Sequence, residues 1–200
     1  MSLSAELRFY RNTMMRNIIL LFALLLSFMG GKAVAQQAKS PAKILVAYFS
    51  YSGNTRTVAE QIQKATGADI FEIKVKNAYP SDYQELLDRA KKQIENHTRP
   101  ALVSMPKNLS QYDIIFIGSP NWWSTIAPPV ATFLSQCNSS AVTFVPFVTH
   151  GGGGMAKCET DIKALCPKSK MLKGLAINGS SVQDAAPRVE KWLRGLDIIK

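Results

Sequence analysis

Three short polar stretches of the sequence follow runs of apolar residues, and their residue types are suited to ligand binding. The first stretch joins the apolar run 44–49 to a predicted helix. Backbone N–H groups at the start of a helix, together with the helix dipole, favour a bound anion, and glycine lets the backbone approach it closely. An ordinary serine–glycine turn with a helix cap is the alternative. The residues of this candidate phosphate loop are Ser50, Tyr51, Ser52, Gly53, Asn54 and Thr55.

The second stretch, residues 118–125, contains two adjacent tryptophans, Trp122 and Trp123. Two neighbouring loop residues can hardly both point inward, and a large indole ring is costly to leave in water. We therefore expect a flat ligand to stack on one of the indoles, with Pro120 and Asn121 beside it. The alternative is one tryptophan in the core and one at the surface or in an interface.

The third stretch, residues 149–154, places four consecutive glycines after a threonine and a histidine. Such a run has a high entropic cost unless its backbone must come close to another group. We expect its amides to bond the polar edge of a flat heterocycle, and a flexible loop is the alternative. His150 is interpreted as a hydrogen-bonding residue, and no catalytic residue is assigned. The candidate ligand contacts are Thr149, His150, Gly151 and Gly152.

Motifs of several other functional classes are missing from the sequence. The first stretch lacks the lysine and the spacing of a nucleoside-triphosphate loop, and no Gly-x-Gly-x-x-Gly motif occurs, so a monophosphate held by neutral donors fits best. A hydrolase is disfavoured because there is no Gly-x-Ser-x-Gly motif and the only histidines are His97 and His150. The histidines and cysteines lack the spacing of zinc ligands, so no metal is expected.

Strands and helices are predicted to alternate after residue 43, which indicates an α/β fold. Because crossovers between parallel strands are right-handed, the pattern predicts a doubly wound parallel sheet of five strands with helices on both faces. Ligands bind such sheets at the carboxyl ends of the strands, where the three polar stretches lie. The predicted strands are residues 43–50, 69–76, 113–118, 141–148 (interrupted by Pro146) and 171–177, and the main predicted helices are 57–65, 81–96, 128–136 and 184–196.

The first 35 residues are typical of a secretory signal peptide. Three arginines precede an apolar run of 11 residues at 18–28, which is too short to span a bilayer, and Ala33-Val34-Ala35 supplies a small-residue cleavage site. An uncleaved anchor or a buried helix is the alternative. We expect residues 1–35 to be removed, 36–42 to form a polar leader, 43–200 to form the domain, and the protein to be periplasmic or extracellular.

The charge and the cysteines of the chain limit its partners. The net charge is +10, and without residues 1–35, which hold four basic residues and one acidic residue, it is +7. The basic residues are spread along the chain and form no arginine-rich helix, so a nucleic-acid partner is not expected. The three cysteines, Cys137, Cys158 and Cys166, allow one disulfide that includes Cys137, or three buried thiols.

With these motifs on one edge of a sheet, the chain resembles the flavodoxin family from about residue 43 to residue 196. The run from strand to Ser-Tyr-Ser-Gly-Asn-Thr matches the family's phosphate loop, and the second and third stretches resemble its flavin loops. The resemblance implies strand order 2-1-3-4-5 and non-covalent FMN. It also implies that loop 50–55 holds the phosphate, that Trp122 or Trp123 flanks the isoalloxazine ring, and that Thr149, His150 and Gly151 line its pyrimidine edge.

The resemblance implies electron transfer through FMN, with the redox partner left open. Flavodoxins of the electron-transfer type are acidic and mostly cytosolic, whereas this chain is basic and is expected to be exported. An FMN-dependent NAD(P)H:quinone-type oxidoreductase, with a small acceptor such as a quinone, is a second hypothesis. A module that binds FMN without turnover is a third, so the sequence leaves open whether the protein is an enzyme.

Overall fold

The computed structural model describes residues 42–137 and 141–200. The predicted signal peptide and all of the predicted leader except Ala42 lie outside these residues. No helix in the described part of the chain is long and apolar enough to cross a membrane. The described residues belong to one compact unit, which begins at Pro41.

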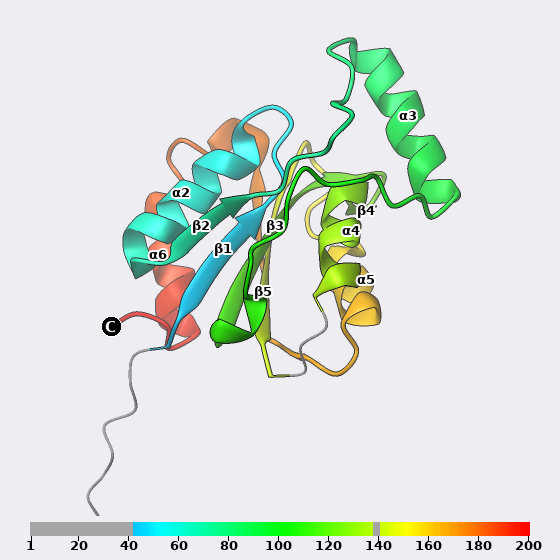
Figure 1. Cartoon of the computed structure of the whole chain (residues 1–200). Coiled ribbons are helices and arrows are strands. Elements are labelled where there is room, and N and C mark those ends of the chain that lie inside the picture. Colours follow the sequence, from blue (N-terminus) through cyan, green and yellow to red (C-terminus); the bar gives the residue numbers. More distant parts are fainter. Residues whose placement is uncertain (1–41, 138–140) are drawn as a thin grey trace, which may run out of the picture. The chain divides into compact units, whose positions relative to one another are not determined.

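A parallel sheet forms the centre of this unit, in the order β2-β1-β3-β5, with β6 and β7 both pairing with β5 (Figure 1). Among the parallel strands counted along the chain, β5 is the fourth, and β6 and β7 together are the fifth. The observed order is therefore the predicted order 2-1-3-4-5. A short antiparallel strand, β4, pairs with the end of β3. The strands are β1 (Ile44–Tyr48), β2 (Asp69–Glu72), β3 (Ile114–Trp122), β4 (Thr125–Ile126), β5 (Thr143–His150), β6 (Lys170–Met171) and β7 (Leu175–Asn178).

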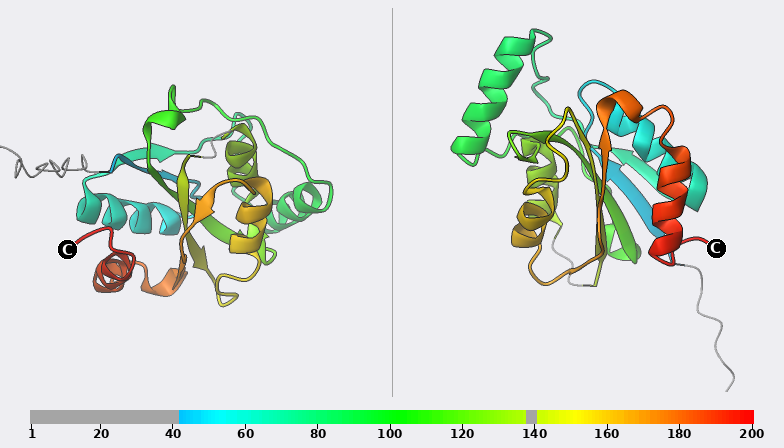
Figure 2. Two further views of the ribbon diagram at one scale, coloured as in Figure 1. Left: turned by 90° about the horizontal axis from the view of Figure 1, so that it is seen from below. Right: turned by 180° about the vertical axis from the view of Figure 1, so that it is seen from behind.

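Helices cover both faces of the sheet, as predicted. In Figures 1 and 2, α2 and α6 lie on one face and α4 and α5 on the other, while α3 stands away from both layers. Asp82 caps α3 by accepting a hydrogen bond from the N–H of Glu85. The helices are α2 (Asn54–Thr66), α3 (Tyr83–Glu95), α4 (Pro128–Gln136), α5 (Cys158–Leu165) and α6 (Ala186–Gly195), with short 3₁₀ turns at Leu109–Gln111 and Gly179–Ser181.

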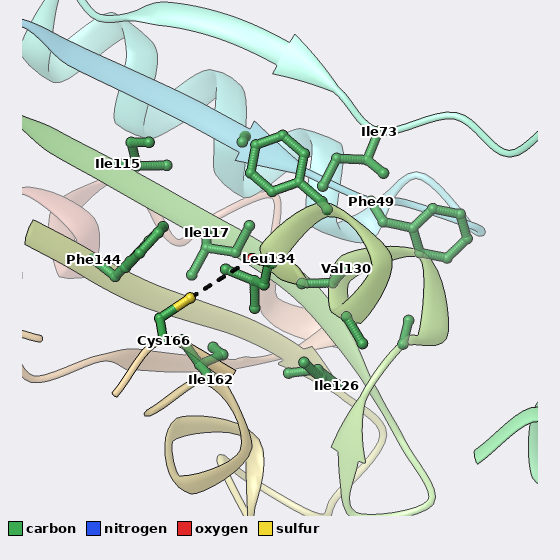
Figure 3. Close-up of a cluster of buried hydrophobic side chains, with 14 of the residues drawn as sticks. Phe49, Ile73, Ile115, Ile117, Ile126, Val130, Leu134, Phe144, Ile162 and Cys166 are labelled. Atoms are coloured by element: carbon green, nitrogen blue, oxygen red, sulfur yellow. Dashed lines mark hydrogen bonds between the residues drawn. The ribbon is translucent and has the colours of Figure 1, made fainter. Parts of the chain in front are cut away.

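Each face of the sheet has its own apolar core, because side chains alternate along the strands. In β3, Ile115 and Ile117 pack toward α4 and α5, whereas Phe116 packs toward α2 and α6. Figure 3 shows the first of these cores, where Phe144 and Leu134 lie among the same side chains. The apolar runs of the sequence therefore correspond to strands that are covered on both sides.

The three cysteines are free thiols in the structure. Cys158, the first residue of α5, and Cys166, which follows its last residue, are buried in the core on the α4 and α5 side of the sheet, and Cys137 packs against this core. Burial raises the pKa of Cys137 and that of Cys158 to about 12. The structure therefore agrees with the interpretation of the cysteines as small apolar residues.

One predicted strand is shorter in the structure, and another is divided in two. The strand predicted at 69–76 ends at Glu72, after which the chain leaves the edge of the sheet and Val75 forms an isolated antiparallel bridge with Leu102. The strand predicted at 171–177 is divided into β6 and β7, because the chain between them leaves the ladder. There the N–H of Gly174 is bonded to the carboxylate of Glu159 at 2.6 Å.

The prediction that Pro146 interrupts its strand is wrong. Pro146 lies within β5 and pairs with Ile117 of β3. On its other side β5 faces the gap between β6 and β7, where the carbonyl oxygen of Pro146 lies beside Gly174. Because no strand partner occupies that gap, the missing N–H of proline leaves no ladder bond unmade.

Candidate functional site

The three polar stretches meet at the carboxyl edge of the sheet, as predicted. They follow β1, β3 and β5, which are parallel neighbours. From β1 the chain continues to β2 on one side, whereas from β3 it continues to β5 on the other. Loops that leave adjacent strands in opposite directions open a crevice between them, and open α/β sheets bind their ligands there.

The first loop ends on the amino terminus of α2. This helix starts three residues earlier than predicted, at Asn54, so Asn54 and Thr55 form its first turn. Their N–H groups have no acceptor within the helix, whereas the N–H of Arg56 is bonded to the hydroxyl of Ser50 at 3.2 Å. Gly53 has φ +92°, and a Cβ there would meet nothing within 4 Å. The turn is thus open to an anion on its outer side.

A buried contact joins the first loop to the third. The hydroxyl oxygens of Thr55 and Thr149 lie 2.8 Å apart, and their residues are 1% and 4% exposed. Asn54 also lies close to Gly179, in a fourth segment of the chain. A Cβ at Gly179 would lie 2.6 Å from the side-chain nitrogen of Asn54. Sequence reasoning missed Gly179, although its place at the end of the last strand is a signal that could have identified it.

The second stretch is not the loop that the sequence predicts. β3 continues to Trp122, and its last residues pair with β4 to form a hairpin (Asn121 with Ile126, Trp122 with Thr125). Pairing satisfies backbone groups that a loop would leave to solvent. Asn121 ties this hairpin to the third stretch, because its side-chain nitrogen donates to the carbonyl of Gly154 at 2.9 Å.

The two tryptophans have different surroundings. Trp122 is half-buried in an aromatic cluster, with ring centroids 5.5 Å from Phe49, 6.1 Å from Tyr51 and 5.0 Å from Tyr79. Trp123 is 50% exposed at the tip of the hairpin. The arrangement matches the alternative of one packed and one exposed tryptophan, and both rings border a cavity of about 300 Å³ under α3. Tyr79 of this cluster was not predicted, because it lies outside the three stretches.

The glycine stretch leaves β5 with its backbone accessible. The N–H of Gly152 is bonded to Nδ1 of His150 at 3.0 Å, so a neutral His150 carries its proton on Nε2. Gly152 and Gly154 have φ +136° and +64°, conformations that favour glycine. Gly151 is different: its φ lies outside that region, and a Cβ there would meet nothing within 4 Å. Neither conformation nor packing within the described chain explains why residue 151 is a glycine.

Electrostatics at this edge are set by neutral donors in the three stretches and by paired charges beside the first loop. The three stretches contain no Asp or Glu. Next to the first loop, Arg56 forms an ion pair with Glu72, which lies 3.4 Å from Lys74 as well. Burial raises the pKa of Tyr79, so this phenol stays protonated, and its hydroxyl donates to Gln93 at 2.6 Å.

The fold and this edge agree with comparisons to known proteins. A family model described as flavodoxin matches residues 43–196. A protein of Bacteroides eggerthii described as a candidate flavoprotein is 30% identical, with a TM-score of 0.65 over 76% of this chain and 96% of that one. A flavoprotein of Lactobacillus acidophilus in complex with FMN is 26% identical, with a TM-score of 0.62 over 72% of this chain and 97% of that one. The family match spans most of the sequence, so the chain belongs to the flavodoxin family.

Proposed function

We propose that this protein binds FMN without a covalent bond at the carboxyl edge of its sheet and acts in electron transfer. The observation that carries the proposal is the turn from β1 into α2. It presents the free N–H groups of Asn54 and Thr55, an open face at Gly53, and hydroxyl groups, and it contains no cation. This donor set suits a phosphate monoester.

The hydroxyl pair of Thr55 and Thr149 supports this assignment of the phosphate. Either oxygen can be the donor in their contact. If Thr149 donates to Thr55, the proton of Thr55 is free to bond a phosphate oxygen at the helix terminus. The same contact holds the first and third loops together, so that a phosphate on one loop and a ring on the other can belong to one ligand.

The unexplained glycine at position 151 supports the position of the ring. A flat heterocycle that lies against the backbone requires a residue without a side chain, and Gly151 follows His150 at the end of β5. The Nε2–H of His150 and the accessible amides of this stretch are donors for a polar ring edge. Trp122 or Trp123 supplies an indole face at the other side of the crevice.

Bound FMN would supply the redox chemistry by accepting and releasing electrons. The chain around it provides no carboxylate in the three stretches, so a negative charge on the reduced ring would meet no acidic residue there. We propose that the protein acts outside the cytoplasm, which rests on residues 1–35 alone. An FMN-dependent NAD(P)H:quinone-type oxidoreductase and a non-catalytic FMN module are the competing functions.

Absorption spectroscopy of the purified protein tests the cofactor. We expect a yellow protein that releases FMN rather than FAD on unfolding. We also expect Gly151→Ala to weaken FMN binding at least about tenfold, which corresponds to a loss of about 1.4 kcal/mol. Gly195→Ala is the matched control. A Cβ at residue 195 also meets nothing within 4 Å, and this residue is the last one of α6.

A colourless protein that takes up no FMN would refute the proposal, and equal FMN affinity in both glycine variants would refute the position of the ring. Oxidation of NAD(P)H with a quinone acceptor would favour the oxidoreductase. Reduction of bound FMN without transfer to any acceptor, protein or small molecule, would favour the non-catalytic module.

A further inference from the structure

A second cavity lies on the other side of the hairpin tip, between the end of α3 and the layer formed by α4 and α5. Its volume is about 400 Å³, which falls in the range of about 300–1,000 Å³ typical of small-molecule sites. Ile126, Pro128 and Ala131, all buried residues, form part of its apolar lining. None of the predicted phosphate-loop or glycine-loop residues lines it.

Trp123 borders this cavity and also the cavity beside Trp122. It occupies the first central position of the two-residue turn between β3 and β4, with φ +53°, and Ser124 follows with φ +67°. Two positive φ angles define a turn for which Asn-Gly is strongly preferred, and a bulky residue there is strained. Strained backbone conformations of this kind cluster at ligand-binding and active sites.

Within the described structure, the indole of Trp123 has little to hold it in that strained position. Half of the residue is exposed, and its cationic neighbour is the ammonium group of Lys91, 5.4 Å from the ring centroid. Exposed cation–π contacts of this kind are weak. The ring therefore presents aromatic surface to the cavity without a large contribution to the core.

The charged groups of the cavity favour an anion. Arg99 and Lys157 line it, and its single acidic residue, Asp161, already accepts a hydrogen bond from the hydroxyl of Thr125. The backbone of Lys157 is held at the hairpin tip, because its N–H donates to the carbonyl of Ser124 at 3.0 Å. The lining thus combines two basic residues, one acidic residue, apolar side chains and the indole of Trp123. The guanidinium of Arg99 also donates to the carbonyl of His97 at 3.5 Å.

From this combination we propose that the cavity binds a small, flat aromatic molecule that carries one carboxylate or sulfonate group. The aromatic ring lies against Trp123 and the apolar lining, and the anionic group is paired with Arg99 and Lys157. Trp123 is one of the two indoles named for the FMN ring, but no other residue of the proposed FMN site lines this cavity, and the proposal does not require bound FMN. A ligand here shares Trp123 with the cavity on the opposite side of the hairpin.

Isothermal titration calorimetry of the purified chain with 2-naphthoate tests the site. We expect 2-naphthoate to bind more tightly than neutral 2-naphthylmethanol. Arg99→Gln and Lys157→Gln should each weaken naphthoate binding about tenfold and leave naphthylmethanol binding almost unchanged. Arg188→Gln, which removes an exposed arginine on α6, is the matched control and should leave both affinities unchanged.

Ala164→Trp is a second test, because residue 164 is an exposed position of α5 that lines the cavity. The larger side chain should fill the cavity and abolish naphthoate binding without disturbing the core, and circular dichroism checks the fold. The proposal is overturned if folded wild-type protein binds no naphthoate at millimolar concentration, or if the Ala164→Trp variant binds it normally. Loss of naphthoate binding on addition of FMN would assign the probe to the flavin site and also overturn it, whatever the outcome for FMN itself.

Discussion

Replacement of Thr55 by valine removes one hydroxyl of the pair that joins the first and third loops, while the shape of the side chain is kept. The hydroxyl oxygens of Thr55 and Thr149 are 2.8 Å apart in a buried environment. When the Thr55 hydroxyl is removed, the hydroxyl of Thr149 remains buried but lacks this hydrogen-bond partner. Leaving it unpaired costs about 1–3 kcal/mol of folding free energy. We expect Thr55→Val to lower the free energy of unfolding by that amount, and Thr149→Val to have a similar effect.

The double variant distinguishes a hydrogen bond from two independent effects. When both hydroxyls are replaced by methyl groups, no polar atom of the pair is left unpaired, and such replacements can be nearly neutral. We therefore expect the double variant to be more stable than either single variant. Urea unfolding of the FMN-free proteins measures the four free energies, and in a domain of this size about 1 kcal/mol corresponds to a shift in Tm of about 2–4 °C.

The result that would refute this reasoning is additivity. If the double variant loses the sum of the two single effects, the contact contributes no coupling energy. FMN titration of the same proteins then tests the phosphate contact separately. If the Thr55 hydroxyl also bonds phosphate, the double variant should bind FMN weakly even though its stability is restored. If the double variant binds FMN with full affinity, the Thr55 hydroxyl only joins the two loops.

Three further predictions concern stability. Gly118→Ala should destabilise the fold by about 1–3 kcal/mol in urea unfolding, because its Cβ would lie 2.2 Å from the ring of a buried phenylalanine, whereas Gly195→Ala should not destabilise it. Because burial raises the pKa of Cys137 and that of Cys158 to about 12, native protein should react slowly with a thiol reagent at pH 8, and the free energy of unfolding should fall as the pH rises above the ordinary thiol value of 9.0. Asp82→Ala, which removes the cap of α3, should cost about 1 kcal/mol, and an undiminished melting temperature would contradict this.

The residue pattern was sufficient for a doubly wound parallel sheet and for the edge at which the polar stretches gather, whereas the strand order came from the resemblance to flavodoxins. Buried parallel strands are covered on both faces, so β1 and β3 contain continuous apolar runs that stand out without any knowledge of their partners. Right-handed crossovers then place the ends of these strands on one edge. The amino terminus of α2 was located within three residues, because a hydroxyl-rich turn commonly precedes a helix.

Features that no local sequence signal indicates were missed. The β3–β4 hairpin has Trp-Ser at its tip, and this dipeptide is not a turn signal. The contact between Thr55 and Thr149 joins residues 94 positions apart, and no local pattern indicates it. The expectation that Pro146 interrupts its strand also failed for this reason. A strand tolerates a proline where no neighbouring strand would accept a hydrogen bond from that residue's N–H, and here the gap between β6 and β7 removes the acceptor.

Two residues of the candidate site depart from what local structure favours, and the two ligand proposals depend on them. Gly151 is a glycine although neither its φ nor its neighbours require one, and Trp123 is a bulky residue where the turn favours glycine or asparagine. Departures from local preference are expected at functional sites, where a ligand supplies the missing contact. The first departure provides space for a ring against the backbone, and the second provides an aromatic surface between two cavities. Gly151 follows β5 and Trp123 lies in the turn between β3 and β4, and the two proposals require different ligands. Failure of the FMN proposal would therefore leave the cavity bordered by Arg99 and Lys157 in place, and failure of the second proposal would leave Gly151 and the phosphate loop in place.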